Sequence, residues 1–160
     1  MPTQALQSTC VATPIVAGGN MNTMLYGTST TRMKIITSVA ADSCGGTYVA
    51  DSTNNRLLYF PAGSFRASCV YGQPDFASSD SNHGATTHSG DTLNSPQSVR
   101  LDAANNLYVA DSFNQRVLRF PPGSTNATAV WGQTTLWHGI SNCNALGLQH
   151  PADALPDSKG

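Results

Sequence analysis

Residues 98–133 decide the fold, and they read SVRLDAANNLYVADSFNQRVLRFPPGSTNATAVWGQ. Residues 38–73 read SVAADSCGGTYVADSTNNRLLYFPAGSFRASCVYGQ, and the two segments are identical at 19 of 36 positions without a gap. Self-similarity at a fixed offset, here 60 residues, is the mark of a duplicated supersecondary unit.

Each copy contains four short β-forming runs that are separated by turn signals. In the second copy we expect strands at about 98–101, 107–111, 116–120 and 129–132. The matching runs of the first copy are 38–41, 47–51, 56–60 and 69–72. The turn after the first strand holds Asn105-Asn106 in one copy and Gly45-Gly46 in the other, and these residue types tolerate a positive φ.

The third run of the first copy, Leu57-Leu58-Tyr59-Phe60, is apolar at every position. A strand with one face in water alternates apolar and polar residues, whereas a strand covered on both faces can be apolar throughout. A repeated four-stranded antiparallel sheet that is covered on both faces fits a blade between two other blades better than it fits a two-layer sandwich. The sequence therefore predicts an all-β protein made of β-propeller blades.

An Asp at the end of the second strand and an Arg at the start of the third recur as Asp51 with Arg56 and as Asp111 with Arg116. A hairpin places the two side chains of each pair opposite one another, within reach of a charge-assisted hydrogen bond. One interpretation is a catalytic carboxylate beside an anion-binding arginine. Because the pair recurs in both units, we favour a structural clip that holds the hairpin.

The pattern YVADSxNxRxLxFPxGS, followed by V-aromatic-G-Q, resembles the NHL repeat over residues 38–133. The resemblance implies a β-propeller, most often six-bladed, and a module that usually binds a ligand. The family includes RNA- or protein-binding tripartite-motif proteins, extracellular sensor domains of bacterial kinases and a peptide-amidating metallolyase. The chain departs from the family in its long segment 74–95 and in the turn after the first strand, which lacks the usual acidic-glycine pair. Two units are also too few to close a ring.

The domain organisation that follows has two complete blades, at 36–73 and 96–133, and we expect the chain to be a fragment of a longer propeller. Residues 1–35 are predicted to hold the remnant of a preceding blade, with a strand near 14–18, and 151–160 the start of a third blade. The segments 74–95 and 134–150 are predicted to be inter-blade loops. The partner of such a fragment is the rest of the parent propeller, or a second copy if the fragment is expressed alone.

Composition limits the other classes of protein. The net charge is −1 and only 11% of residues are charged, which argues against the basic surface of a nucleic-acid binder. No stretch approaches the roughly 20 apolar residues of a membrane span. The N-terminal residues lack the basic start and apolar core of a signal peptide, and the compartment is left open, with an extracellular location as one alternative.

The inserted segment 74–95 contains His83 and His88 among aspartates, and a metal site there is conceivable, but the spacing defines no ligand geometry. We therefore predict no metal and no cofactor. Propeller loops usually carry the binding specificity, so His83, His88, Phe113 and Trp137 are the candidate ligand-facing residues. Tyr71 and Trp131 occupy equivalent strand positions and are predicted to be structural residues.

Asn126-Ala127-Thr128 is an N-glycosylation sequon in a predicted exposed turn. Cys44 and Cys69 fall on positions about 10 Å or more apart, beyond disulfide reach. Cys10 and Cys143 lie in irregular segments, so four unpaired thiols are expected, with a bridge between blades as the alternative.

The predicted function is a non-enzymatic interaction module that binds a protein, peptide or glycan through its loops. The alternative is a piece of a propeller lyase or hydrolase whose metal site lies in other blades, and a weaker alternative is RNA binding. The inner strands 38–41 and 98–101 offer no His or Glu for catalysis, which favours the binding module.

Overall fold

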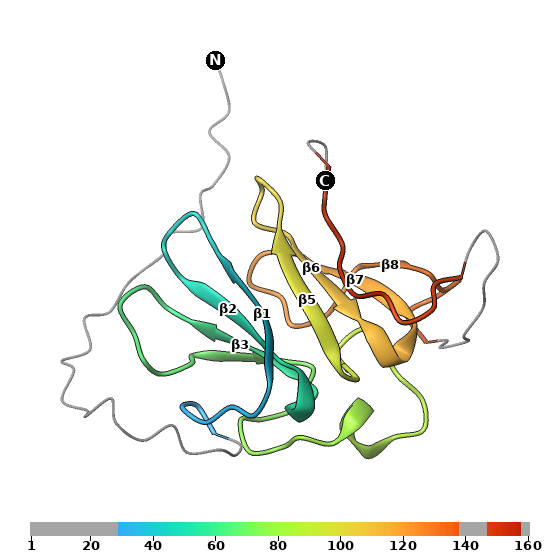
Figure 1. Ribbon diagram of the computed structural model, residues 1–160, viewed down its shortest axis with the longest axis horizontal. Coiled ribbons are helices and arrows are strands. Elements are labelled where there is room, and N and C mark those ends of the chain that lie inside the picture. The colour runs from blue at the N-terminus through green and yellow to red at the C-terminus, as the bar shows by residue number, and fades with distance from the viewer. Residues whose placement is uncertain (1–28, 138–146, 158–160) are drawn as a thin grey trace.

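The computed structural model describes residues 29–137 and 147–157, which form two four-stranded antiparallel sheets (Figure 1). The first sheet consists of β1 (Ile36–Ala41), β2 (Thr47–Asp51), β3 (Arg56–Phe60) and β4 (Cys69–Tyr71). The second consists of β5 (Pro96–Leu101), β6 (Leu107–Asp111), β7 (Arg116–Phe120) and β8 (Ala129–Trp131). Strands neighbour one another in chain order within each sheet. The predicted all-β fold of propeller blades is confirmed.

The two sheets share one strand register. Asp51 pairs with Arg56 in the first sheet, as Asp111 pairs with Arg116 in the second. In the first strand of each sheet the pairing register shifts at the same place, between Ile36 and Ser38 in β1 and between Pro96 and Ser98 in β5. Strand β5 includes this shift and begins at Pro96. The first strand of the second sheet is therefore longer than the predicted 98–101, while its two central strands have the predicted bounds.

The turns use the residue types that the sequence analysis singled out. Gly45 has a φ of 81° and Asn105 a φ of 62°, so one member of each Gly-Gly and Asn-Asn pair takes the left-handed conformation. The hairpin between the two central strands contains a short 3-10 turn in each sheet, η1 (Ser52–Asn54) and η3 (Ser112–Asn114). A third 3-10 segment, η2 (Ser81–Gly84), lies in the loop that joins the sheets.

The hydrophobic core lies between the two sheets, whose first strands β1 and β5 run side by side (Figure 1). It contains side chains from both sheets, namely Tyr48, Ala50, Leu57, Tyr71, Val99, Leu107, Val109, Leu118 and Phe120. The rings of Tyr71 and Phe120 meet edge to face, with centroids 5.6 Å apart, which is a favoured aromatic geometry. Each fully buried large apolar side chain stabilises the fold by about 1.5–3 kcal/mol.

The glycine after β4 lets the inter-sheet loop close onto this core. Gly72 has a φ of 82°, and a side chain there would lie 2.6 Å from the fully buried Leu93. Gly132 repeats this contact with Leu148 in the second sheet. The Gly-Gln ending that both copies share therefore reflects a close approach of the next loop.

Strand β3 is buried on both faces, as its apolar sequence predicts. Leu57 points into the core between the sheets and Leu58 to the other face of the first sheet, and both are fully buried. This observation distinguishes the sheet from one layer of a sandwich, in which one face meets water.

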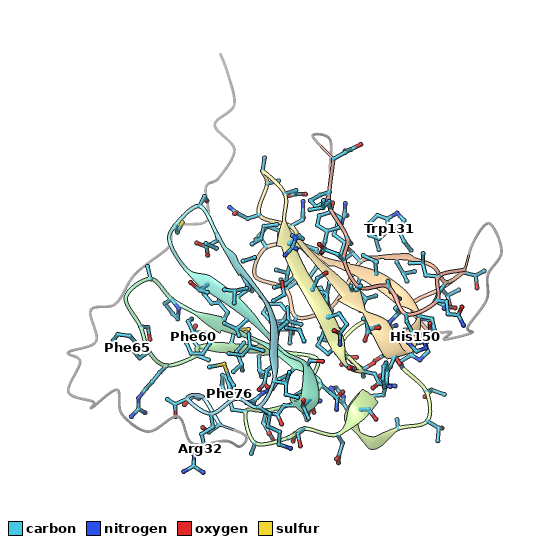
Figure 2. All side chains as sticks on the ribbon, viewed as in Figure 1. Arg32, Phe60, Phe65, Phe76, Trp131 and His150 are labelled. Carbon is cyan, nitrogen blue, oxygen red and sulfur yellow. The ribbon has the colours of Figure 1, made fainter. Side chains whose placement is uncertain are left out.

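The face of the second sheet that points away from the first is exposed at β8, although Tyr108, Ala110 and Val117 on the same face are buried. Trp131 is 44% exposed, whereas its equivalent Tyr71 is 4% exposed (Figure 2). The two equivalent positions therefore differ in exposure, because no further sheet covers Trp131 among residues 29–137 and 147–157. That both residues are structural stays a prediction. The Trp131 ring packs against Tyr108, with centroids 5.8 Å apart.

Residues 147–157 follow the second sheet along β5. Asp153 accepts a hydrogen bond from Arg100 of β5 at 2.7 Å, within a part-exposed ion pair. The predicted start of a third blade at 151–160 is described only to residue 157, and the predicted strand near 14–18 lies outside the described residues. The division of the chain into domain units therefore stays a prediction.

The antiparallel order gives the pair of sheets two ends. One end, which we call the turn end, carries the turns 42–46, 61–68, 102–106 and 121–128. The other, the loop end, carries η1, η3, residues 29–35, the inter-sheet loop 74–95 and residues 147–150. In Figure 1 this loop runs in light green below both sheets.

The cysteines differ from the expectation of four free thiols. Cys44, in the first turn, is disulfide-bonded, whereas Cys69 of β4 is a free thiol. Cys10 and Cys143 lie outside the described residues. The prediction failed because strand spacing addresses only the pair Cys44 and Cys69, whereas a cysteine in an exposed turn can bond to a residue far along the chain.

Burial raises the pKa of the Cys69 thiol, and weaker hydrogen bonds from its surroundings lower it. The thiol form is therefore favoured in the half-buried interior of the sheet pair.

No helix in the described part of the chain is long and apolar enough to cross a bilayer.

Candidate functional site

A buried arginine connects each sheet to two loops. In the first sheet Arg56 Nε donates to Asp51 Oδ2 at 2.9 Å, and both side chains are fully buried. The same guanidinium donates from Nη1 to the Phe76 carbonyl at 2.6 Å, and from Nη2 to the carbonyls of Arg32 at 2.7 Å and Ser29 at 3.3 Å. Arg56 therefore fastens the segment before β1 and the loop after β4 to the central hairpin.

The second sheet repeats this arrangement at the equivalent positions. Arg116 Nε donates to Asp111 Oδ2 at 2.7 Å, and both side chains are again fully buried. Its Nη1 donates to the Leu136 carbonyl at 2.6 Å, and its Nη2 to the Ser89 and Thr92 carbonyls, each at 2.9 Å. Every partner lies 60 residues beyond its counterpart, so we name the arginine, its aspartate and these carbonyls the Asp–Arg hub.

The aspartates of the hub have further donors. Asp51 Oδ1 accepts from the backbone N–H of Lys34 at 2.9 Å, and Oδ2 from Asn54 Nδ2 at 2.8 Å. Asp111 accepts in the same way from the Asn94 N–H at 2.7 Å and from Asn114 Nδ2 at 2.8 Å. A carboxylate with this many donors and no exposure to solvent has no room for a substrate. The geometry supports a structural role.

The loop 74–95 is fixed to the hairpins at the loop end by amide side chains. Asn82 and Asn114 exchange two hydrogen bonds, at 3.0 Å and 2.8 Å, and both side chains are buried. Asn55 donates to the Ser79 carbonyl at 2.9 Å and Gln73 donates to the Asp80 carbonyl at 2.8 Å. The predicted inter-blade loop 74–95 is therefore fixed to the sheets by specific hydrogen bonds.

The four candidate ligand-facing residues have different surroundings. His83 lies in η2 and is exposed, whereas His88 is buried, so His88 does not face solvent as a ligand-facing residue must. Phe113 lies in η3 and is 59% exposed. Trp137 is exposed directly after the hub residue Leu136. No contact brings the four candidates together in the described ranges 29–137 and 147–157.

The structure adds His150 to this surface. Its ring meets the Phe113 ring edge to face, with centroids 5.4 Å apart, and its backbone N–H donates to Gln115 Oε1 at 2.6 Å. Ser95 makes the same backbone contact to Asn55 at 2.8 Å in the preceding unit. The sequence signal for His150 is therefore its alignment with Ser95 just before the first strand of a unit. Phe113 and His150 together form the loop-end aromatic pair.

Among the described residues, no group of side chains is suited to hold a metal ion. Within the described ranges, no three His, Cys, Asp or Glu side chains gather as a metal would require. The aspartates that sequence analysis placed beside His83 and His88 form local turn contacts instead, as Asp75 does with the N–H groups of Ala77 and Ser78.

Comparison with known families agrees with this repeat structure. The NHL repeat model matches residues 93–120, which begin at the buried Leu93 and include β5, β6, η3 and β7. The chain therefore contains an NHL repeat, and the predicted resemblance is confirmed. A comparison with curated proteins finds no match.

Proposed function

We propose that this β-propeller module binds a protein or peptide through its loop end and that it catalyses no reaction. The observation that carries the proposal is the loop-end aromatic pair. Phe113 presents a large apolar ring to solvent, and His150 supports one edge of that ring. Exposed aromatic side chains on a rigid base are frequent anchors of protein interfaces.

The base beneath Phe113 is rigid. Phe113 is the middle residue of η3, its N–H donates to the Asn94 carbonyl at 3.1 Å, and its neighbour Asn114 is buried in the amide pair with Asn82. Little conformational freedom would be lost when a partner covers the ring, which favours binding.

The first sheet has Thr53 at the position of Phe113. Both sheets form the same hairpin and the same Asp–Arg hub, so the fold does not require an aromatic residue at this position. The His150 ring beside it sets Phe113 apart from a singly exposed aromatic residue such as Phe65 and supports a role in recognising a partner.

The other functions have less support. A lyase or hydrolase needs an acid or base that can reach a substrate, and the hub carboxylates of Asp51 and Asp111 are buried and fully engaged. RNA binding needs a basic surface, whereas the net charge is −1 and only 8 residues are Lys or Arg.

A random-peptide phage library selected on the full chain tests the proposal. Recovered peptides would be synthesised, and their affinities measured by fluorescence anisotropy. We expect Phe113→Thr, which installs the residue of the first sheet, to weaken binding about 10- to 100-fold, as loss of an interface anchor of roughly 1–3 kcal/mol does.

Phe65→Thr is the matched control. Phe65 is 64% exposed in the turn 61–68, and Thr125 is its equivalent in the second sheet. Figure 2 places Phe65 on the opposite side of the view from His150. The control should bind the peptides as the wild type does. Equal affinity of Phe113→Thr and the wild type, or failure to select any peptide, would show that the loop end is not a peptide-binding surface.

A further inference from the structure

We propose that Asn126 is an N-glycan acceptor, which places a carbohydrate chain on the turn end of the second sheet. The sequon Asn126-Ala127-Thr128 lies in the turn between β7 and β8. Sequons arise often by chance. This one lies in an exposed turn, and a disulfide-bonded cysteine is present in the same chain.

The acceptor side chain is accessible. Asn126 and Thr128 are both exposed, while Ala127 between them is buried. No hydrogen bond engages the Asn126 amide group within the described part of the chain. Two hydrogen bonds fix the backbone of the turn. The Ala127 N–H donates to the Gly90 carbonyl at 2.8 Å, and the Asn126 N–H donates to Ser124 Oγ at 3.1 Å.

The disulfide of Cys44 is an independent observation that points to the same compartment. Disulfides form and persist in secretory and extracellular environments, where N-glycosylation also takes place. Cys44 lies in the turn 42–46, which belongs to the same end of the sheets as the turn 121–128. The oxidised cysteine and the sequon are therefore consistent with one folding environment.

The modification is a transfer from a lipid-diphosphate-linked oligosaccharide by a membrane-bound oligosaccharyltransferase. The side-chain nitrogen of Asn126 attacks the anomeric carbon of the first sugar. A nitrogen–carbon bond forms, the carbon–oxygen bond to the diphosphate breaks, and the lipid diphosphate leaves with the electron pair. The amide nitrogen gives up one proton, which passes through the transferase to solvent. A carbon–nitrogen bond replaces a carbon–oxygen bond, so no oxidation or reduction takes place.

The first sheet contains the same turn without a sequon. The Arg66 N–H donates to Ser64 Oγ at 3.1 Å, and the Ala67 N–H donates to the Thr30 carbonyl at 3.0 Å. The residues at this position read Arg66-Ala67-Ser68. Arg66→Asn would therefore create a second sequon in a turn of matched geometry. Thr128→Ser imports the first sheet's hydroxyl residue and keeps the sequon, whereas Thr128→Ala removes it.

The proposed glycan lies away from the loop-end aromatic pair, because Asn126 follows β7 and Phe113 precedes it, so the two residues lie at opposite ends of this strand. This inference does not depend on the proposed function, and its test needs no ligand.

The test is cell-free translation of the full chain behind a cleavable secretory signal, with microsomal membranes present. Because the transfer precedes completed folding, gel mobility with and without peptide-N-glycosidase gives the readout even for a variant that folds poorly. We expect one enzyme-sensitive glycan on the wild type and on Thr128→Ser, none on Thr128→Ala, and two on Arg66→Asn.

Two results would overturn the proposal. One is a wild-type chain without a glycan, whether or not Arg66→Asn acquires one. The other is a glycan that persists in Thr128→Ala, since it would have to be attached elsewhere.

Discussion

The two sheets share a buried polar framework and differ in what they expose. The first sheet has Thr53 in η1, the buried Tyr71 in β4 and Arg66 in its last turn. At the equivalent positions the second sheet has Phe113, Trp131 and Asn126. The Asp–Arg hub is the same in both, with the same donors and acceptors. Residues shared by the copies therefore belong to the scaffold, and residues that differ on the surface are where function is to be sought.

The turns after β1 and β5 show how one scaffold position accepts different chemistry. Asp42 Oδ2 accepts from the Tyr59 hydroxyl at 2.9 Å. In the second sheet Asp102 Oδ2 accepts from Asn106 Nδ2 at 2.8 Å and from the Tyr108 hydroxyl at 3.3 Å. Gly46 stands where Asn106 stands, and a side chain there would collide with the Tyr59 ring. The glycine and the tyrosine of the first sheet therefore belong together.

Removing the arginine of the hub should have the largest effect on stability. Arg116→Ala leaves the buried Asp111 unpaired together with three carbonyls, and we expect the free energy of unfolding to fall by about 3–5 kcal/mol. Arg56→Ala should cost a similar amount, because Arg56 has the same set of partners. Urea unfolding followed by circular dichroism measures both.

Arg100→Ala is the control for the hub. Its ion pair with Asp153 is part-exposed, so its loss should cost about 1 kcal/mol or less. If all three alanine variants unfolded at the same urea concentration, the hub would not be the framework that the two sheets share.

Truncation of the equivalent aromatic residues should have a smaller and unequal effect. Tyr71→Ala removes a buried ring that packs on Phe120 and Tyr48, and we expect a loss of about 3 kcal/mol. Trp131→Ala should cost about 1–2 kcal/mol, because Trp131 is half-exposed. Urea unfolding gives both values, and a greater loss for Trp131→Ala would mean that the Trp131 side chain is covered in solution.

The pH dependence of stability should differ between the two turns. Burial, and then the hydrogen bond to Asp42, raise the pKa of Tyr59 from 10.0 to about 12. A raised pKa in the folded state favours the protonated hydroxyl, so this contribution is complete below pH 10 and is lost as the pH rises toward 12. Tyr59→Phe should therefore flatten the alkaline loss of stability.

Asp102 should act in the opposite direction. Burial raises its pKa, but hydrogen bonds from the Asn106 side chain and from the Asn106 and Ala104 N–H groups outweigh burial and lower it below 3.8. Its contribution to stability is therefore present above pH 3.8 and is lost as the pH falls further. Asp102→Asn should reduce the acid dependence of the unfolding midpoint and leave its alkaline dependence unchanged.

The sheets were predictable from sequence because their signals are local and repeated. Turn residues bound each strand, the apolar run 57–60 fixes burial on both faces, and Asp51 and Arg56 stand at facing hairpin positions. Because the unit recurs after 60 residues, each strand predicted in one copy predicts the corresponding strand of the other copy.

Contacts between segments far apart in the chain were not predictable. The carbonyls that Arg56 binds lie 20 to 27 residues away, and no residue type marks a carbonyl acceptor. The disulfide of Cys44 and the burial of His88 also depend on how loops return to the sheets. The exposure of Trp131 could not be predicted, because the repeat indicates which strand position faces a neighbouring sheet but not whether such a sheet covers it.

Exchanging Thr53 and Phe113 in one variant tests most directly whether the shared residues form the scaffold and the differing residues carry the function. If the shared residues form the scaffold, the free energy of unfolding of this variant should stay within about 0.5 kcal/mol of the wild type, as expected for surface positions. Its affinity for loop-end peptides should fall at least 10-fold, because Phe113 is removed from His150. Stability lost by several kcal/mol, with peptide affinity kept, would contradict the account.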